Sequence, residues 1–220
     1  MSCIILNTPQ GSPEWFADRC GAITGSKFTV CRDKYKSACS KGTYKKGDFK
    51  KEARDYAFKL AYERITGELL EDPEFTPWQA KRGNDLEPEA RLKYEGRKGV
   101  LVEQTGLALT EDRLFGASVD GLVDENGSIE IKCFLSPTKL ANIILNGDIG
   151  DCTDQIQGGL WITVRKWCDF VLYCPALAKI GKDLTIIRVV RDDEYIAELE
   201  KDLLEFNCLV NEYETKLRSK

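Results

Sequence analysis

The residues of this sequence whose types and spacing suit hydrolytic chemistry are Asp120, Glu130 and Lys132. Glu130 and Lys132 alternate with apolar residues, so on a β-strand both would share one face while the apolar set enters a core. Two carboxylates can share a hard divalent cation, which generates hydroxide near neutral pH and neutralises charge on a phosphate. An adjacent lysine can orient the water and stabilise that charge. The three residues therefore predict metal-dependent hydrolysis of phosphodiesters.

The chain contains no histidine. This removes the usual general base, the usual zinc ligand and every Ser-His or Cys-His arrangement. A hydrolytic mechanism would therefore depend on oxygen ligands and hard metal ions.

A hairpin must bring these residues together, and an Asn-Gly pair between two apolar runs predicts one. A loop of two residues would pair Asp120 with Cys133, on the wrong face. A loop of three, residues 125–127, would instead place Asp120 opposite Lys132 and diagonal to Glu130, with the glycine in the left-handed conformation. We therefore expect the three-residue loop.

The spacing of these residues resembles the PD-(D/E)XK nuclease signature, which is weak when taken alone. The alternative is a solvated hairpin with a surface Glu-Lys pair. Other parts of the chain must decide between the two.

With 42% hydrophobic and 31% charged residues, the chain of 220 residues is ordinary for a globular protein, and we expect one domain spanning 1–220. No apolar run approaches the ~20 residues of a membrane helix, and the first residues lack the pattern of a signal peptide. The nine cysteines include no Cys-x-x-Cys pair, so we expect mostly buried thiols in a reducing compartment. These features predict a cytoplasmic protein without a membrane segment.

The net charge is −4, but the charged residues are unevenly distributed along the sequence. Residues 27–64 contain twelve basic and five acidic residues, so this segment carries +7 and the remainder −11. One basic lobe on an acidic body suits a protein that follows phosphates on a single face. The alternative is a solvated charged helix.

Two helix starts near the N-terminus offer an anion site. Ser12 is expected to cap a helix that carries Trp15 and Arg19. A second short helix should open within 24–30, which places Ser26 at a helix N-terminus close in sequence to Arg19. An arginine and a serine in this arrangement suit a terminal phosphate, and simple capping is the alternative.

A longer helix should begin at Thr76 and run to about Tyr94. Pro88 would bend it and aim Glu87 inward. The alternative is an ordinary surface ion pair between Glu87 and Arg91, which are four residues apart.

Gln155 and Gln157 belong to a helix expected from residue 153 or 154, and at most one of them can face a site because they point in different directions. The basic segment 33–47 lacks periodicity and is expected to be a mobile loop. The other expected elements are a helix at 48–65, strands at 100–109 and 114–119, a helix at 138–146, strands at 169–174 and 184–190, and a helix from the Asp192 cap to about 217. This order predicts an α/β (α+β) fold with a mixed central sheet and helices on both faces.

Several segments together carry a more specific signal than any one motif. They are residues 15–26, 82–91, 118–121, 130–133 and 154–161. In their order and spacing the chain resembles the phage lambda exonuclease or YqaJ-type viral recombinase family of the PD-(D/E)XK nuclease superfamily. The resemblance implies a restriction-endonuclease-like core.

The resemblance also implies an activity. It is that of a metal-dependent 5′-to-3′ exonuclease that degrades one strand of double-stranded DNA from a 5′-phosphate end, releases 5′-mononucleotides and leaves a 3′ overhang for a single-strand annealing protein. Family members look like ring-shaped homotrimers. The implied cofactor is Mg²⁺, as two ions for which Mn²⁺ can substitute, and the implied setting is the cytoplasm of a bacterial host of a phage or prophage.

Metal ligands follow from the same resemblance. Asp120 and Glu130 would bind the first ion together with the carbonyl of Ile131, and Glu87 would join Asp120 at the second ion. Lys132 would activate the attacking water.

The remaining roles concern water and DNA. By resemblance, Gln155 would help to position the water, while Arg19 and Ser26, with Trp15 beside them, would hold the 5′-phosphate. A basic residue expected near the start of the helix after the signature is missing or replaced by Lys139, which we assign to DNA contact.

Two other hypotheses remain open. One is an endonuclease of the same superfamily, which would need elements that read bases. The other is a non-catalytic module that binds DNA ends, although such a module has no use for several acids facing phosphates.

Overall fold

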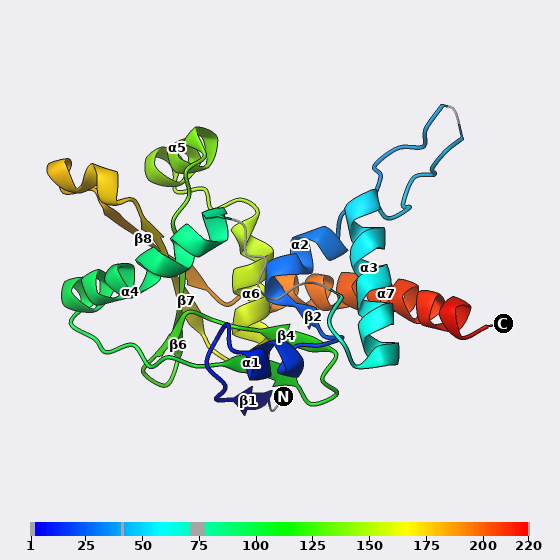
Figure 1. The fold of residues 1–220 in the computed structure, drawn as a ribbon. Coiled ribbons are helices and arrows are strands. Elements are labelled where there is room, and N and C mark those ends of the chain that lie inside the picture. Colours follow the sequence, from blue (N-terminus) through cyan, green and yellow to red (C-terminus); the bar gives the residue numbers. More distant parts are fainter. Residues whose placement is uncertain (1–2, 41, 71–77, 220) are drawn as a thin grey trace.

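A computed structural model describes residues 3–40, 42–70 and 78–219. Within them the chain forms two mixed four-stranded sheets flanked by helices, which confirms the predicted α/β class (Figure 1). We expected one central sheet, and the strands instead divide into two. None of the described helices is long and apolar enough to cross a membrane.

The first sheet has the strand order β1-β3-β4-β2. Its strands are β1 (Cys3–Leu6), β2 (Ile23–Thr24), β3 (Leu107–Thr110) and β4 (Phe115–Ala117). β2 runs parallel to β4, and the other two pairs are antiparallel. The sequence did not predict β1 or β2, because strands of four and two residues are too short to show a period.

The second sheet has the order β5-β6-β7-β8 and contains the predicted hairpin. Its strands are β5 (Gly121–Val123), β6 (Gly127–Lys132), β7 (Trp167–Tyr173) and β8 (Leu184–Val190). β5–β6 and β7–β8 are antiparallel, whereas β6 and β7 are parallel. The crossover between β6 and β7 consists of α5 (Pro137–Asn146) and α6 (Cys152–Ile162).

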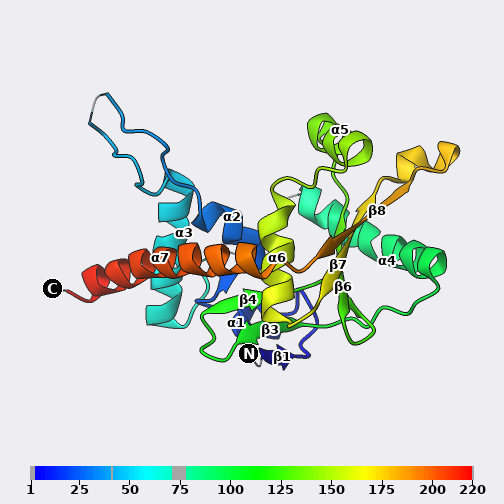
Figure 2. The same ribbon diagram turned by 180° about the vertical axis from the view of Figure 1, so that it is seen from behind.

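Helices cover both faces of the second sheet, as predicted (Figures 1 and 2). Val171 and Tyr173 of β7 pack in one core cluster with Tyr94 of α4 (Trp78–Lys98). Phe170 of the same strand faces the opposite way and packs in a second cluster with Leu160 of α6. Alternate side chains of β7 are thus buried on opposite faces, which fixes the neighbouring strand β6 within the core.

The other helices of the described residues are α1 (Pro13–Asp18), η1 (Gly25–Lys27), α2 (Phe28–Cys31), α3 (Lys51–Thr66), η2 (Pro175–Ile180) and α7 (Asp193–Arg218). The caps predicted at Ser12 and Asp192 are confirmed. Ser12 caps α1 by accepting from the Trp15 amide at 3.1 Å, left-handed Gly67 ends α3, and Asp192 caps α7. α7 packs against α3.

α4 is longer than predicted. It continues through Pro88 to Lys98 instead of ending near Tyr94. Its expected start at Thr76 lies outside the described residues.

Residues 34–49, which we call the basic arm, project from the ends of α2 and α3 (Figure 1). An antiparallel bridge joins Lys34 to Phe49, and the rings of Tyr35 and Tyr44 stack with their centroids 3.5 Å apart. Most of this segment was expected to be a loop without regular contacts. The structure gives it a hydrogen-bonded base and a stacked aromatic pair instead.

The β5–β6 hairpin has the predicted odd loop, but at a different position. Val123 pairs with Gly127, so the loop is residues 124–126, and the register places Asp120 opposite Glu130 rather than opposite Lys132. The left-handed residue is Asp124, with φ of 49°, and not the glycine. Gly127 lies within β6, where a Cβ would approach the ring of Trp167 to 2.2 Å. The glycine is therefore required by packing and not by the turn.

The cysteines differ from expectation as well. All nine are free thiols, but only Cys31, Cys152 and Cys168 are buried, and Cys208 is exposed. The prediction that most would be buried was wrong, because helical positions such as Cys208 of α7 face the solvent.

Two helical glycines should respond to alanine in opposite ways. At Gly158 in α6 a Cβ would lie 2.2 Å from the Phe28 ring, whereas at Gly96 in α4 it would meet nothing within 4 Å. We expect Gly158→Ala to lower the free energy of unfolding by about 1–3 kcal/mol through overpacking. Gly96→Ala should raise it by up to about 1 kcal/mol through helix propensity. Urea denaturation of both variants tests this, and equal effects would contradict the packing of α6 on α2.

Candidate active site

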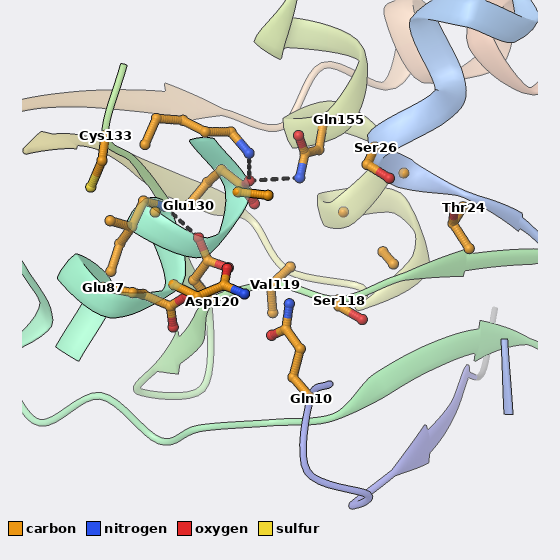
Figure 3. A pocket seen from close by; sticks show the side chains of 18 of the residues that line it. Gln10, Thr24, Ser26, Glu87, Ser118, Val119, Asp120, Glu130, Cys133 and Gln155 are labelled. Atoms are coloured by element: carbon orange, nitrogen blue, oxygen red, sulfur yellow. Dashed lines mark hydrogen bonds and ion pairs between the residues drawn. The ribbon is translucent and has the colours of Figure 1, made fainter. Parts of the chain in front are cut away.

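A pocket of about 860 Å³ lies where the two sheets meet, and residues from β2, η1, α4, β6 and α6 line it (Figure 3). It contains every residue to which the sequence analysis assigned a role. These are Trp15, Arg19, Ser26, Glu87, Asp120, Glu130, Ile131, Lys132, Lys139 and Gln155. Segments more than a hundred positions apart in the sequence therefore share one cavity.

One end of the pocket is built on the β5–β6 hairpin. The Glu130 side chain is only 4% exposed, and its Oε1 lies 2.6 Å from the Lys132 ammonium. The Gln155 amide nitrogen donates to the same oxygen at 2.6 Å. Asp120 Oδ2 accepts from the Ile131 backbone amide, also at 2.6 Å. Both carboxylates and the lysine thus face the pocket and not the core, as the hairpin hypothesis required. Figure 3 shows the two carboxylates.

Glu87 reaches the same end of the pocket from α4 (Figure 3). It forms an ion pair with Arg91, and the side chains are 23% and 12% exposed. The alternative of an ordinary surface pair is therefore wrong, because both partners are largely buried. Glu87 is directed inward just before Pro88, as the sequence analysis expected.

Burial and mutual repulsion make these acids reluctant to ionise. Burial raises the pKa of Glu130 to about 7, against the opposing attraction of Lys132. Burial and then the charge of Asp120 raise the pKa of Glu87 to about 7. Burial also raises the pKa of Asp120. Burial alone would lower the pKa of Lys132, but the neighbouring Glu130 and Asp120 carboxylates outweigh it and raise that pKa.

The acids are not arranged as a ligand set in this conformation. Among the described residues, no group of three acidic, cysteine or histidine side chains is placed to hold a metal ion. Glu130 is turned to Lys132, Glu87 to Arg91, and Asp120 to a backbone amide. The protein's own donors therefore neutralise each carboxylate.

The other end of the pocket is rich in donors for an anion. Arg19 donates to the Thr24 hydroxyl at 3.2 Å, and its guanidinium lies 4.6 Å from the centre of the Trp15 ring. The Trp15 indole donates to Ser118 Oγ at 3.2 Å. Ser26 is exposed in the first turn of η1. An arginine and serine hydroxyls converging in this way suit a phosphate group.

Trp15 lies beside Arg19 in the pocket, and the residue is only 7% exposed. It connects Arg19 to Ser118 and thereby fixes two groups of the anion-binding end. Lys139, by contrast, lies at the pocket rim with 48% of its side chain exposed.

Sequence reasoning assigned no role to several polar residues of the pocket, among them Gln10, Thr24 and Ser118. Ser118 could have been found, because it stands two positions before Asp120. Gln10 belongs to the turn before α1 and carries no local signal. Figure 3 shows its amide pointing into the pocket below Val119.

The two glutamines of α6 separate as predicted, with one in the site. Gln155 contacts Glu130, whereas Gln157 is buried and donates to the carbonyl of Val190 at 2.9 Å. Gln157 also accepts from the amide of Asp192 at 3.0 Å. It therefore fastens the junction of β8 and α7 and takes no part in the site.

Comparisons with known proteins agree with this arrangement. The sequence matches the YqaJ-like viral recombinase domain family over residues 14–165. An alkaline exonuclease, LHK-Exo, from Laribacter hongkongensis is 30% identical with a TM-score of 0.77, over 94% of this chain and 96% of that one. The structure of the same enzyme in complex with dAMP is 31% identical in sequence, with a TM-score of 0.78 and the same coverage of both chains.

A phage-related exonuclease from Haemophilus somnus 129PT shares the fold, with 18% identity and a TM-score of 0.59 over 89% of this chain and 94% of that one. A search of the curated proteins found no match. The family match covers more than half of the chain, and it supports a nuclease, and more narrowly an exonuclease, function. On this match and on the shared fold, the chain belongs to the YqaJ-like viral recombinase domain family.

Proposed function

We propose that the protein is a Mg²⁺-dependent 5′-to-3′ exonuclease that acts on ends of double-stranded DNA, releases 5′-mononucleotides and leaves 3′ overhangs. The observation that carries this proposal is the division of one pocket into two ends. Carboxylates and Lys132 lie at one end, and Arg19 with serine hydroxyls lies at the other. Figure 3 labels Glu87, Asp120 and Glu130 of the first end and Ser26 and Ser118 of the second. A strand end could place its terminal phosphate at the second end and its first phosphodiester at the first.

This division favours an exonuclease over an endonuclease of the same superfamily. A terminal phosphate monoester occurs only at a strand end, and it offers more charge and more acceptor oxygens than an internal phosphodiester. Arg19 can donate to two of those oxygens at once. An endonuclease would have no use for a separate group of donors beyond the scissile phosphate.

The donor atoms of the acidic end fit magnesium by their chemistry. Glu87, Asp120 and Glu130 offer carboxylate oxygens and Ile131 a carbonyl, all of which are hard ligands. Burial first, and then repulsion from the neighbouring carboxylates, raises the pKa of Glu87 and of Glu130, and a bound divalent cation would stabilise their ionised forms. Bound there, the ion would act as a Lewis acid and lower the pKa of a bound water, and Mn²⁺ should substitute.

The chain's own residues have separate tasks in this proposal. Lys132 can donate to the attacking water or to a phosphate oxygen, since its ammonium borders the pocket beside Glu130. Gln155 holds the Glu130 carboxylate in place. Arg19 and Ser26 hold the 5′-phosphate, which aligns the next phosphodiester with the acids.

The basic arm supports a duplex substrate. Its sixteen residues, 34–49, include five lysines and one aspartate. Lys34 pairs with Glu205, but the side chains of Lys36, Lys45 and Lys46 form no ion pair with any acid in the described part of the chain. Unpaired lysines on a projecting arm can follow the phosphates of a duplex beyond the cut.

Four further proposals rest on family membership. We propose that the protein works as a ring-shaped homotrimer and passes its 3′ overhang to a single-strand annealing protein. We also propose that it acts in the cytoplasm of a bacterial host. The whole chain, residues 1–220, would form one nuclease domain.

The proposal predicts the polarity of digestion. A linear duplex labelled separately at each 5′ and 3′ end should lose the 5′ labels first as mononucleotides, only with Mg²⁺, and a closed circle should stay intact. Lys132→Ala should bind the duplex but cut at least ~100-fold more slowly, because a donor to the developing charge is lost. Cutting of the circle would favour the endonuclease, and binding without cutting by the wild type would favour a non-catalytic module.

A second prediction concerns the terminal phosphate. A 5′-hydroxyl end should react ~10–100-fold more slowly than a 5′-phosphate end, which is the value of one or two hydrogen bonds to a charged group. In Arg19→Ala this preference should nearly vanish, whereas in Arg218→Ala, which alters an exposed residue outside the pocket, it should persist. Equal rates on both ends with the wild type would reject the roles of Arg19 and Ser26.

A third prediction concerns pH in the absence of metal. Because the pKa of both Glu87 and Glu130 is raised from 4.5 to about 7, the folded protein holds more protons than the unfolded chain between these values. Stability should therefore fall as pH rises through this window, by on the order of 3 kcal/mol for Glu130.

Urea denaturation in chelator at about pH 5 and pH 7 tests this expectation. Glu130→Gln should flatten the dependence, because the amide cannot ionise. A wild type whose stability rises over this window, with the same slope in Glu130→Gln, would show that the acids are not under the electrostatic strain described here.

A further inference from the structure

We propose that Arg91 is a positioning residue, which holds the Glu87 carboxylate toward Asp120 and thereby sets the affinity of the pocket for a divalent cation. This inference rests on the proposed function. It concerns a residue that lines no part of the pocket itself and is paired directly with Glu87.

The first step of the argument is the geometry of α4. Arg91 lies one helical turn after Glu87 and pairs with it directly. Pro88, between them, has no backbone N–H to donate to the carbonyl of Asn84 and loosens the helix at this turn. The backbone alone therefore holds Glu87 weakly. The ion pair with Arg91 must determine the direction in which the Glu87 carboxylate points.

The second step is the anchoring of Arg91 on its other side. With its amide oxygen turned to the guanidinium, Gln104 accepts from Arg91 Nη2 at 3.0 Å. Glu103, its neighbour, exchanges two backbone hydrogen bonds with Leu122 of β5, at 2.9 and 2.8 Å. β5 begins directly after Asp120. Arg91 therefore links the helix that carries Glu87 to the strand that directly follows Asp120.

The third step is charge. The charge of Asp120 disfavours ionisation of Glu87. The positive charges of Arg91 and Lys132 favour the ionised form of both carboxylates. Lys132 is already engaged with Glu130 at 2.6 Å, so Arg91 is the cation that is paired directly with Glu87. Without it, repulsion from Asp120 would turn the Glu87 side chain away from the pocket.

The fourth step separates positioning from mere stabilisation. Arg91 Nε is buried and has no hydrogen-bond partner among the described residues, which is an unfavourable arrangement for a purely structural arginine. Buried ion pairs are commonly no more stabilising than apolar residues of similar volume. The presence of an arginine with an unpartnered buried Nε therefore needs a reason other than stability. Orienting the Glu87 carboxylate is that reason.

The test measures binding of Mn²⁺ by the electron paramagnetic resonance of the free ion, with no substrate present. We expect the wild type to bind Mn²⁺, Arg91→Met to bind it at least ~10-fold more weakly, and Arg91→Lys to lie between them, as for other residues that orient metal ligands. Arg97→Met is the matched control. Arg97 lies on the same helix but donates to the carbonyl of Leu184, so this variant should bind within about twofold of the wild type.

A second readout distinguishes positioning from general damage. In Arg91→Met the Mg²⁺ concentration for half-maximal cutting should rise ~10-fold while KM for DNA changes less than about threefold. Gln104→Leu should shift the Mg²⁺ requirement in the same direction by a smaller factor. Should Arg91→Met fail to fold, Arg91→Lys and Gln104→Leu decide the question.

The outcomes separate this inference from the proposed function. If the wild type itself does not bind Mn²⁺, the proposed metal dependence is wrong. If the wild type binds and Arg91→Met binds equally well, Arg91 does not position a ligand. Tighter binding by Arg91→Met would also overturn the inference, because Arg91 would then compete with the cation.

Discussion

The crowding of acids in a buried pocket is the constraint on which the rest of this structure depends. Asp120, directly before β5, stands opposite Glu130 of β6, and Glu87 joins them from α4. Carboxylates placed so close in a site of low polarity repel each other and resist ionisation. Lys132 and Arg91 offset this charge, and the packing of Ile129 and Ile131 in the core fixes the strand that carries Glu130.

The first sheet and its helices supply the second half of the pocket. Arg32 of the α2 end donates to Asp154 of α6 at 2.5 Å and to Asp202 of α7 at 2.8 Å. Asp154 immediately precedes Gln155, so this buried network fixes the helix that reaches Glu130. The packing that joins the two sheets therefore also aligns the anion-binding end with the acidic end.

The parts of this structure that depend on interactions between residues close in sequence could be predicted from the sequence. The helix caps at Ser12 and Asp192 and the odd hairpin loop follow from short-range rules. The exact loop position does not, because it depends on Trp167, which lies forty residues after Gly127 in the sequence. Likewise, no local pattern separates the strands into two sheets.

The site shows the same limit. Spacing alone left Asp120, Glu130 and Lys132 as a weak signature, and only the combination of distant segments indicated the family. The burial of Trp15 could not be foreseen, because it depends on packing against Leu107 and Leu109 of the first sheet. Side-chain contacts between remote segments are what the sequence does not reveal.

The most direct test of the central claim is a crystal structure of Lys132→Ala soaked with Mn²⁺ and a short duplex bearing a 5′-phosphate. The account predicts an anomalous manganese signal between Asp120 and Glu130, with the terminal phosphate bound by Arg19 and Ser26. Manganese at another place, or a 5′-phosphate bound away from Arg19, would contradict it.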